Sequence, residues 1–341
     1  MEDVNALVRD IRSSKCESSI ARDIIEGMRQ EPRNLPTILL YSEKGLQAYD
    51  RHSHAPGYYP RQEELLILQK QARNIANSIE NGSVLLDLGS ASLDKTLLLL
   101  EALEAAGKDV QYFALDLDHN ELVSTLKTLP LDQFKHVSCA ALHGTFDDGL
   151  QWLHSAPEIA ELPKCVMFLG STIGNFSRAE AAAFLKQVAM KALTRAPGTS
   201  SIILTVDGCK VPTKILHAYT GDGVLPFTLS AMEYASAIMS KHTQSAENAF
   251  NVDDWTTMSE WNSTHGRYEA SFTPMSSDVQ LGPPFEDVVI KKGDKIRIVY
   301  SHKYDETERQ ELFDNAGLYQ VQHWTEDNCD LGFYQVKLPP N

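Results

Sequence analysis

Hydrophobic and polar residues form blocks along the middle of the chain, and the period of the pattern changes from block to block. From Gln62 to Glu80 the apolar positions recur at helical spacing, and Asn81-Gly82 supplies a stop signal. Val84 to Leu88 is a short apolar run of strand length. A loop beginning at Gly89 and a leucine-rich helix from about Asp94 to Ala106 follow it. These segments predict one strand–helix unit.

The same alternation continues over the next hundred residues. Strands are expected at Tyr112–Leu115, His136–Leu142, Cys165–Leu169 and Ser201–Val206, and helices between them at Asp118–Lys127 and Ala179–Leu193. Strands that are apolar on both faces and separated by helices indicate an α/β fold with a mainly parallel sheet. In such sheets ligands bind where the strands end at their carboxyl side.

The alternation stops after Asp207, and this change suggests the domain organisation. Residues 209–294 are rich in turn-forming residues, and strand alternation returns only near residues 295–304. A helix at Glu306–Ala316 and strands near Tyr319–Trp324 and Gly332–Leu338 close the chain. We therefore expect residues 1–61 and 209–294 to form a second lobe. Residues 62–208 would form a Rossmann-like domain that residues 295–341 complete.

Composition narrows the choice of partners and location. The net charge of −15 disfavours nucleic acid and anionic membrane surfaces as partners. No apolar run is long enough to span a bilayer. The five cysteines are odd in number and far apart, and residues 1–12 hold no apolar signal segment, so a cytoplasmic location is expected. No metal site is expected, because the histidines form no His-Glu-x-x-His motif.

The loop that follows the predicted strand Val84–Leu88 contains a single glycine, Gly89. A dinucleotide fingerprint needs a second glycine to admit a pyrophosphate, so this loop favours a nucleoside and disfavours a nicotinamide-dependent dehydrogenase. Asp116, which ends the next strand, is placed to accept hydrogen bonds from two ribose hydroxyls. Together these residues favour a Rossmann-like methyltransferase domain that binds S-adenosylmethionine (SAM). A plain tight turn at Gly89 and a helix N-cap at Asp116 are the structural alternatives.

Longer matches connect the chain with a known family. The segments Leu39–Gly45, Tyr58–Glu63, Leu86–Thr96 and Phe168–Phe176 closely resemble, in the same order, the histidine-specific N-methyltransferase family. Within it, Tyr49–Leu68 and Ala141–Leu150 are most similar to the fungal branch of ergot-alkaloid pathways. The resemblance implies a class I methyltransferase fold with a second, substrate-binding lobe. It also implies SAM-dependent methylation of the α-amino group of 4-dimethylallyl-L-tryptophan. Tryptophan or another aromatic amino acid as substrate, and a catalytically inactive binding subunit, are the alternatives.

The resemblance also assigns cofactor contacts by position. These fall on Gly89, Lys95, Asp116, Thr145, Phe146 and Gly170. Thr145 departs from the family pattern, because the histidine enzymes usually carry an aspartate there. The contact with the adenine amine is therefore expected to be weaker or to be taken over by Asp147. A solvated helix position is the alternative for Lys95.

Substrate residues follow from the same resemblance. Tyr41 and Asn175 match positions near the reacting amine, Asn175 and Tyr219 match those that hold the α-amino and α-carboxylate groups, and Tyr58, Val299 and Ser301 match substrate-lining positions. Histidine enzymes carry a glutamate at the Val299 position, and an apolar residue there suits a prenylated indole instead. Interior packing is the alternative for the tyrosines. A helix N-cap is the alternative for Asn175, although Ser177 competes for that position.

Overall fold

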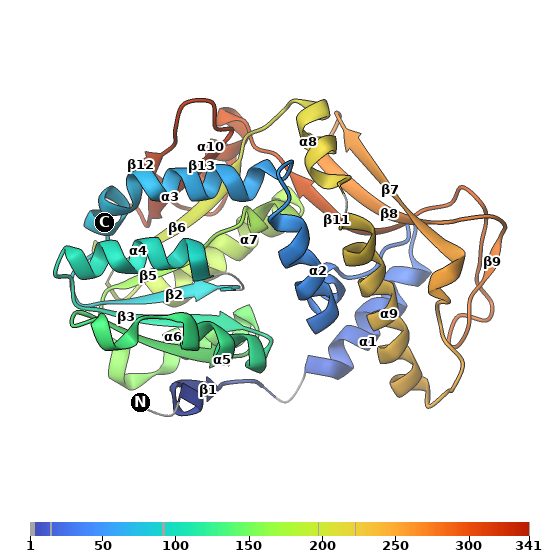
Figure 1. The fold of residues 1–341 in the computed structure, drawn as a ribbon, viewed down its shortest axis with the longest axis horizontal. Coiled ribbons are helices and arrows are strands. Elements are labelled where there is room, and N and C mark those ends of the chain that lie inside the picture. The colour runs from blue at the N-terminus through green and yellow to red at the C-terminus, as the bar shows by residue number, and fades with distance from the viewer. Residues whose placement is uncertain (1–3, 14–15, 91–92, 197, 222, 341) are drawn as a thin grey trace. The chain divides into compact units, whose positions relative to one another are not determined.

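The computed structural model describes residues 4–13, 16–90, 93–196, 198–221 and 223–340 (Figure 1). The chain separates into two compact units. Unit 1 comprises Met1–Ser13, Pro60–Cys209 and Lys303–Asn341, and unit 2 comprises Ser14–Tyr59 and Lys210–His302. These units differ from the expected ones chiefly because residues 1–13 belong to unit 1 and residues 295–302 belong to unit 2. Pro60, Arg61 and Cys209 also belong to unit 1.

Unit 1 is built on an eight-stranded sheet with the order β1-β4-β3-β2-β5-β6-β13-β12. The strands are β1 (Val8–Asp10), β2 (Ser83–Leu88), β3 (Val110–Asp116), β4 (Val137–His143), β5 (Lys164–Phe168), β6 (Ser201–Asp207), β12 (Tyr319–Trp324) and β13 (Leu331–Lys337). All neighbouring strands pair in parallel except β13, which runs antiparallel to both β6 and β12. The α/β Rossmann-like class with a mainly parallel sheet is thus confirmed.

Helices cover both faces of this sheet because successive strand residues point to opposite sides. Leu86 and Leu88 pack in one apolar cluster with α6 (Phe146–Ser155), α7 (Arg178–Val188) and α10 (Glu306–Asn315). Leu85 packs in a second cluster with α3 (Tyr59–Ser78), α4 (Leu93–Ala105) and α5 (His119–Thr128). Short helical turns at Val4–Leu7, Leu131–Gln133, Pro157–Ile159, Thr172–Asn175 and Ala189–Leu193 complete the unit.

Unit 2 combines helices with a small antiparallel sheet. The helices are α1 (Cys16–Arg29), η2 (Thr37–Tyr41), α2 (Glu43–Ser53), α8 (Pro212–Tyr219), α9 (Val224–Thr243) and η7 (Val252–Asp254). The sheet order is β11-β8-β7, with β7 at Trp255–Asn262, β8 at Arg267–Pro274 and β11 at Ile296–His302; β9 (Val279–Gln280) pairs with β10 (Val289–Ile290). Helix α9 packs against α1, α2 and η2.

Two features explain the corrected boundaries. Strand β1 adds in parallel to the edge of β4, which ties the first described residues to unit 1. The strand expected at residues 295–304 exists as β11, but its hydrogen-bond partner is β8 of unit 2. An alternating pattern identifies a strand without identifying the strand that pairs with it.

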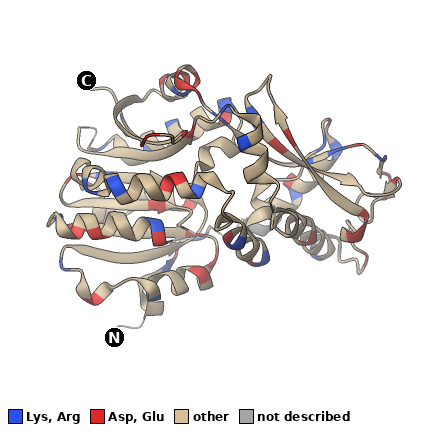
Figure 2. Ribbon diagram, turned by 45° about the horizontal axis from the view of Figure 1, so that its top comes forward, with Lys and Arg blue, Asp and Glu red and all other residues tan. Residues whose placement is uncertain are grey.

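No helix among the described residues is long and apolar enough to cross a membrane. Figure 2 shows acidic and basic residues interleaved along the helices of the sheet unit.

Candidate active site

The loop after β2 is held against β3 by its backbone. Gly89 has a φ of +79°, and the amides of Gly89 and Ser90 donate to the carbonyl oxygen of Leu115 over 2.9 and 3.2 Å. The positive φ explains the glycine, since a side chain there would be strained. The ring of Phe146 lies 3.6 Å from where a Cβ on Gly89 would be. The rest of the predicted loop, Ala91 and Ser92, lies outside the described residues.

Asp116 ends β3 beside this loop. One oxygen of its carboxylate accepts from the Asp118 amide over 3.1 Å. Asp118, not Asp116, caps α5, because its side chain accepts from the amides of Asn120 and Glu121. The N-cap alternative for Asp116 is therefore wrong. Burial raises the pKa of Asp116 to about 6, against the lowering effect of backbone hydrogen bonds.

A second buried carboxylate lies on the strand that leads to Gly89. Asp87 accepts from the Tyr112 hydroxyl over 3.0 Å and from the Thr96 hydroxyl over 3.1 Å. Burial raises the pKa of Asp87 to about 6, while these two hydrogen bonds lower it. Since Thr96 lies in the first turn of α4, Asp87 fixes the start of that helix relative to β2.

Lys95, also in the first turn of α4, forms an ion pair with Glu64 of α3. The Lys95 side chain is only 15% exposed, which excludes the solvated alternative. The other oxygen of Glu64 accepts from the Gly170 amide over 2.6 Å and from the Thr205 hydroxyl over 3.1 Å. Glu64 thus joins two of the predicted cofactor residues, and the sequence analysis missed it. Its local signals were its place directly after the Tyr58–Glu63 motif and within the matching segment Tyr49–Leu68.

Thr145 and Phe146 begin α6. Thr145 is the N-cap: its hydroxyl accepts from the Asp148 amide over 3.2 Å and donates to Asp148 Oδ2 over 2.7 Å. Asp147 is exposed and accepts from the Gln187 side chain over 2.7 Å.

The Phe146 ring meets Phe168 edge-on with 5.6 Å between centroids. The ring is therefore fixed beside Gly89, and the Thr145 proton is already used within the helix cap.

The turn after β5 contains Gly170 and leads to Asn175. Gly170 and Ser171 both have left-handed backbone, with φ values of +72° and +54°. Asn175 ends the short helix Thr172–Asn175 and is partly exposed. Ser177 is the N-cap of α7, in a capping box with Glu180. The N-cap alternative for Asn175 is therefore wrong.

In unit 2, Tyr58 is the centre of an aromatic cluster. Its ring lies 5.6 Å from that of Tyr219, 6.3 Å from that of Tyr49 and 4.7 Å from that of His52. Burial raises the pKa of Tyr58 well above its ordinary value and lowers that of His52 to about 4. Both groups are therefore neutral near pH 7.

The small sheet of unit 2 extends this cluster. Tyr219 stacks on Tyr268 of β8 with 4.5 Å between ring centroids. Ser301 is the cross-strand partner of Tyr268, and Val299 is the partner of Ala270. Because paired residues of antiparallel strands point to the same side, these four side chains share one face of the sheet. The structure thus brings together Tyr58, Tyr219, Val299 and Ser301, and it adds Tyr268, which nothing in the sequence pattern singled out.

Tyr41 is the last residue of η2, directly before Ser42, the N-cap of α2. It is partly exposed. The predicted site residues are divided between the units: the cofactor set and Asn175 belong to unit 1, whereas the tyrosines, Val299 and Ser301 belong to unit 2.

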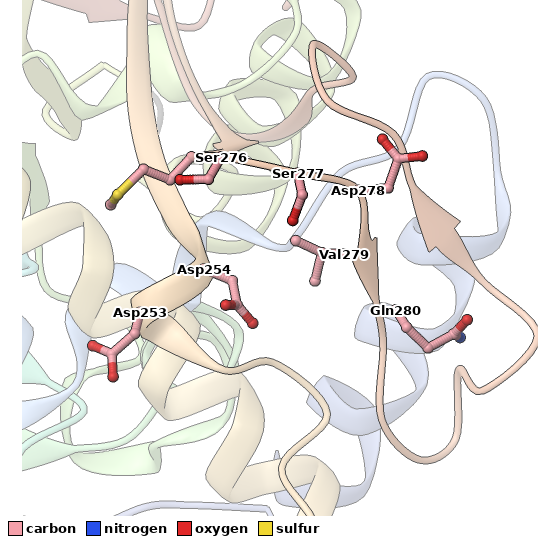
Figure 3. Close-up of a pocket in the computed structure, with 8 residues that line it drawn as sticks. Asp253, Asp254, Ser276, Ser277, Asp278, Val279 and Gln280 are labelled. Atoms are coloured by element: carbon pink, nitrogen blue, oxygen red, sulfur yellow. The ribbon is translucent and has the colours of Figure 1, made fainter.

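A separate pocket lies on unit 2 (Figure 3). Its lining consists of Asp253, Asp254, Met275, Ser276, Ser277, Asp278, Val279 and Gln280, and it includes none of the predicted site residues. In the described ranges no group of three His, Cys, Asp or Glu side chains could hold a metal ion.

Comparison with known proteins identifies a family of SAM-dependent methyltransferases. Residues 20–338 match the model of the histidine-specific, SAM-dependent methyltransferases. The chain is 51% identical over 334 residues to the 4-dimethylallyltryptophan N-methyltransferase of Arthroderma benhamiae, covering 98% of each protein. It is 50% identical to that of Aspergillus fumigatus, covering 97% of each, and 48% identical to that of Claviceps purpurea, covering 97% of this chain and 98% of the relative.

Proposed function

The chain belongs to the histidine-specific, SAM-dependent methyltransferase family, and we propose that it methylates the α-amino group of 4-dimethylallyl-L-tryptophan. The products are the N-methyl amino acid and S-adenosylhomocysteine. We also propose a cytoplasmic location, since the unpaired thiols of Cys139 and Cys165 suit a reducing compartment.

The residues at the carboxyl edge of the sheet suit a nucleoside cofactor. The hydroxyls of Ser90 and Ser171 are buried and have no hydrogen-bond partner among the described residues, so each can bond to a ligand. Asp116 would accept from the ribose hydroxyls, and Phe146 would lie against the adenine. Lys95 and the Gly170 turn would contact the remaining polar groups of SAM. When bound, SAM supplies an electrophilic methyl group on a positively charged sulfur.

The substrate assignment rests mainly on one observation, the apolar and aromatic face of the unit 2 sheet. Val299 lies on this face beside Ala270 and the stacked pair of Tyr268 and Tyr219. A carboxylate at position 299 would recognise an imidazole, whereas a valine offers dispersion contact to a prenylated indole. Tyr219 would hold the α-carboxylate through its hydroxyl, and Ser301 and Tyr58 would line the same pocket.

The protein's part in the reaction is alignment and exclusion of water. The nucleophile must be the neutral amine, and an unperturbed α-amino group has a pKa of about 7.7 to 8.0, so modest desolvation supplies the required form. Asn175 and Tyr41 would orient the amine lone pair by hydrogen bonds. The released proton leaves to water, because an unperturbed phenol has a pKa near 10 and is a weak base at neutral pH.

A substrate panel tests this function. The purified protein is incubated with SAM and 4-dimethylallyltryptophan, tryptophan or histidine, and the products are measured by mass spectrometry. We expect the prenylated substrate to give the highest kcat/KM and a mass gain of whole methyl groups. A preference for histidine would contradict the substrate assignment, and the absence of S-adenosylhomocysteine with every substrate would contradict the reaction.

A further inference from the structure

Glu64 is a buried carboxylate that contacts three separate elements of unit 1. Its side chain is 1% exposed. It pairs with Lys95 of α4, accepts from the Gly170 amide after β5, and accepts from Thr205 of β6. A carboxylate out of water costs several kcal/mol unless its oxygens are paired and hydrogen-bonded. Here the three donors satisfy both oxygens, so the charge is tolerated and the geometry around it is defined.

The contacts of Glu64 extend into the strained turn after β5. The Thr205 hydroxyl donates to Glu64 and accepts from the Ser171 amide over 2.8 Å. Ser171 has left-handed backbone, which a serine adopts only when its surroundings impose it. The carboxylate of Glu64 and the hydroxyl of Thr205 therefore fix both consecutive left-handed residues, Gly170 and Ser171.

We propose that Glu64 is a positioning residue for the cofactor, holding the Lys95 ammonium and the Gly170 amide in the geometry that SAM requires. This proposal rests on the proposed function, because Lys95 and Gly170 are its predicted cofactor contacts. Glu64 reaches both elements at once: one oxygen holds the start of α4, and the other holds the turn after β5. It touches no reacting atom in this assignment and acts only through its neighbours.

The two functions of the carboxylate can be separated by substitution. In Glu64→Gln the remaining carbonyl oxygen still accepts from the Gly170 amide and from Thr205. The amide nitrogen that replaces the second oxygen is a donor and cannot pair with the Lys95 ammonium. The variant therefore removes the Lys95 anchor while the turn after β5 keeps its acceptor.

Glu63→Gln is the matched control. Glu63 is the neighbouring residue on α3, is also buried, and accepts from the amides of Asp330 and Leu331 over 2.7 and 3.0 Å. These two hydrogen bonds hold the chain at the start of β13, so the substitution disturbs that strand. A general loss of stability would weaken cofactor binding in both variants, whereas a positioning effect would weaken it in Glu64→Gln alone.

The experiment measures S-adenosylhomocysteine binding by calorimetry and steady-state kinetics in the full chain. In Glu64→Gln we expect the dissociation constant of S-adenosylhomocysteine to rise about tenfold and the KM for SAM to rise, with the KM for the amino acid unchanged. Glu63→Gln should bind the cofactor almost as tightly as wild type. Adding Lys95→Met to Glu64→Gln should weaken binding little further, since the two residues act as a unit. Unchanged cofactor binding in Glu64→Gln, or purely additive effects in the double variant, would overturn the proposal.

Thr205 provides a second test if Glu64→Gln does not fold. Thr205→Val removes the hydroxyl that links Glu64 to Ser171, whereas Thr205→Ser keeps it. We expect about threefold weaker binding of S-adenosylhomocysteine in the valine variant and wild-type binding in the serine variant; equal binding in both overturns the proposal. A wild-type protein that binds no S-adenosylhomocysteine would instead contradict the proposed function itself.

Discussion

Lys303 donates a hydrogen bond to Asp207 over 2.6 Å, and neither side chain is more than 1% exposed. Asp207 ends β6 just before the chain leaves unit 1, and Lys303 is the residue at which the chain returns. The Tyr304 amide also donates to the Asp207 carbonyl over 2.8 Å. This buried pair therefore joins the two chain crossings at which residues 210–302 are inserted.

Lys303→Met should strongly destabilise unit 1. The change removes the Lys303 ammonium from the buried Asp207 carboxylate, and breaking a buried pair from one side costs about 3–5 kcal/mol. Urea unfolding followed by fluorescence measures the loss. Lys295→Met is the control, since its pair with Glu260 is well exposed and should contribute less than about 1 kcal/mol. Equal stability of the two variants would contradict the role given to Lys303.

The sequence predicted the parallel sheet because its strands are buried on both faces. Runs such as Ser201–Val206 are mostly apolar and buried along their whole length, which is typical of a strand in a parallel sheet covered on both faces. The strands β7 and β8 were missed because polar residues interrupt them and one face of each is partly exposed. Helix α9 was missed because Gly221 and Gly223 precede it and Pro226 lies in its first turn, which together suggested a loop.

The site was predictable only where a local motif carries the chemistry. Gly89 follows β2 and Asp116 ends β3, and these two strands are neighbours in the sheet. Glu64 could not be found this way, because an acid on a helix usually lies in water and its partner Gly170 is far away in sequence. Tyr268 was missed for a related reason: its stacking on Tyr219 depends on a strand pairing that the sequence does not specify.

Thr145→Ala should destabilise α6. Thr145 forms a capping box with Asp148, and loss of an N-cap typically costs about 1 kcal/mol. Thermal unfolding should show a Tm lowered by a few degrees. Thr145→Ser keeps the cap and should unfold like wild type. If the alanine variant were as stable as the serine variant, the hydroxyl would not stabilise the helix.

Cofactor binding should strengthen as the pH rises from 5 to 7. Burial raises the pKa of Asp116 to about 6, so its carboxyl is mostly protonated at pH 5 and ionised at pH 7. Ribose hydroxyls donate to the ionised form, and binding therefore releases the proton. We expect the dissociation constant of S-adenosylhomocysteine to fall about tenfold between pH 5 and pH 7. Calorimetry at a series of pH values measures it.

Asp116→Asn is the control for this titration. The amide cannot ionise, so the affinity should be lower at pH 7 and nearly independent of pH. Asp87 has a similarly raised pKa, but its carboxylate is bonded to Tyr112 and Thr96. A pH dependence that persists in Asp116→Asn would assign the titration to another group.

Tyr219→Phe should weaken binding of the amino acid and spare the cofactor. The phenylalanine keeps the stacking on Tyr268 and loses only the hydroxyl. A hydrogen bond to the charged α-carboxylate contributes about 1.5–3 kcal/mol, which predicts a rise of about tenfold or more in the KM for the amino acid. The dissociation constant of S-adenosylhomocysteine should not change. Equal losses for both ligands would contradict the substrate role of Tyr219.

Val299→Glu should reverse the substrate preference. Val299 is partly buried on the face it shares with Ala270 and Tyr268, so a carboxylate there is poorly solvated beside a prenyl group and well placed beside an imidazolium. We expect kcat/KM for 4-dimethylallyltryptophan to fall at least tenfold and kcat/KM for histidine to rise. Val299→Gln, similar in size but uncharged, should lose the prenylated substrate without gaining histidine. If both variants kept the wild-type preference, residue 299 would not determine the substrate.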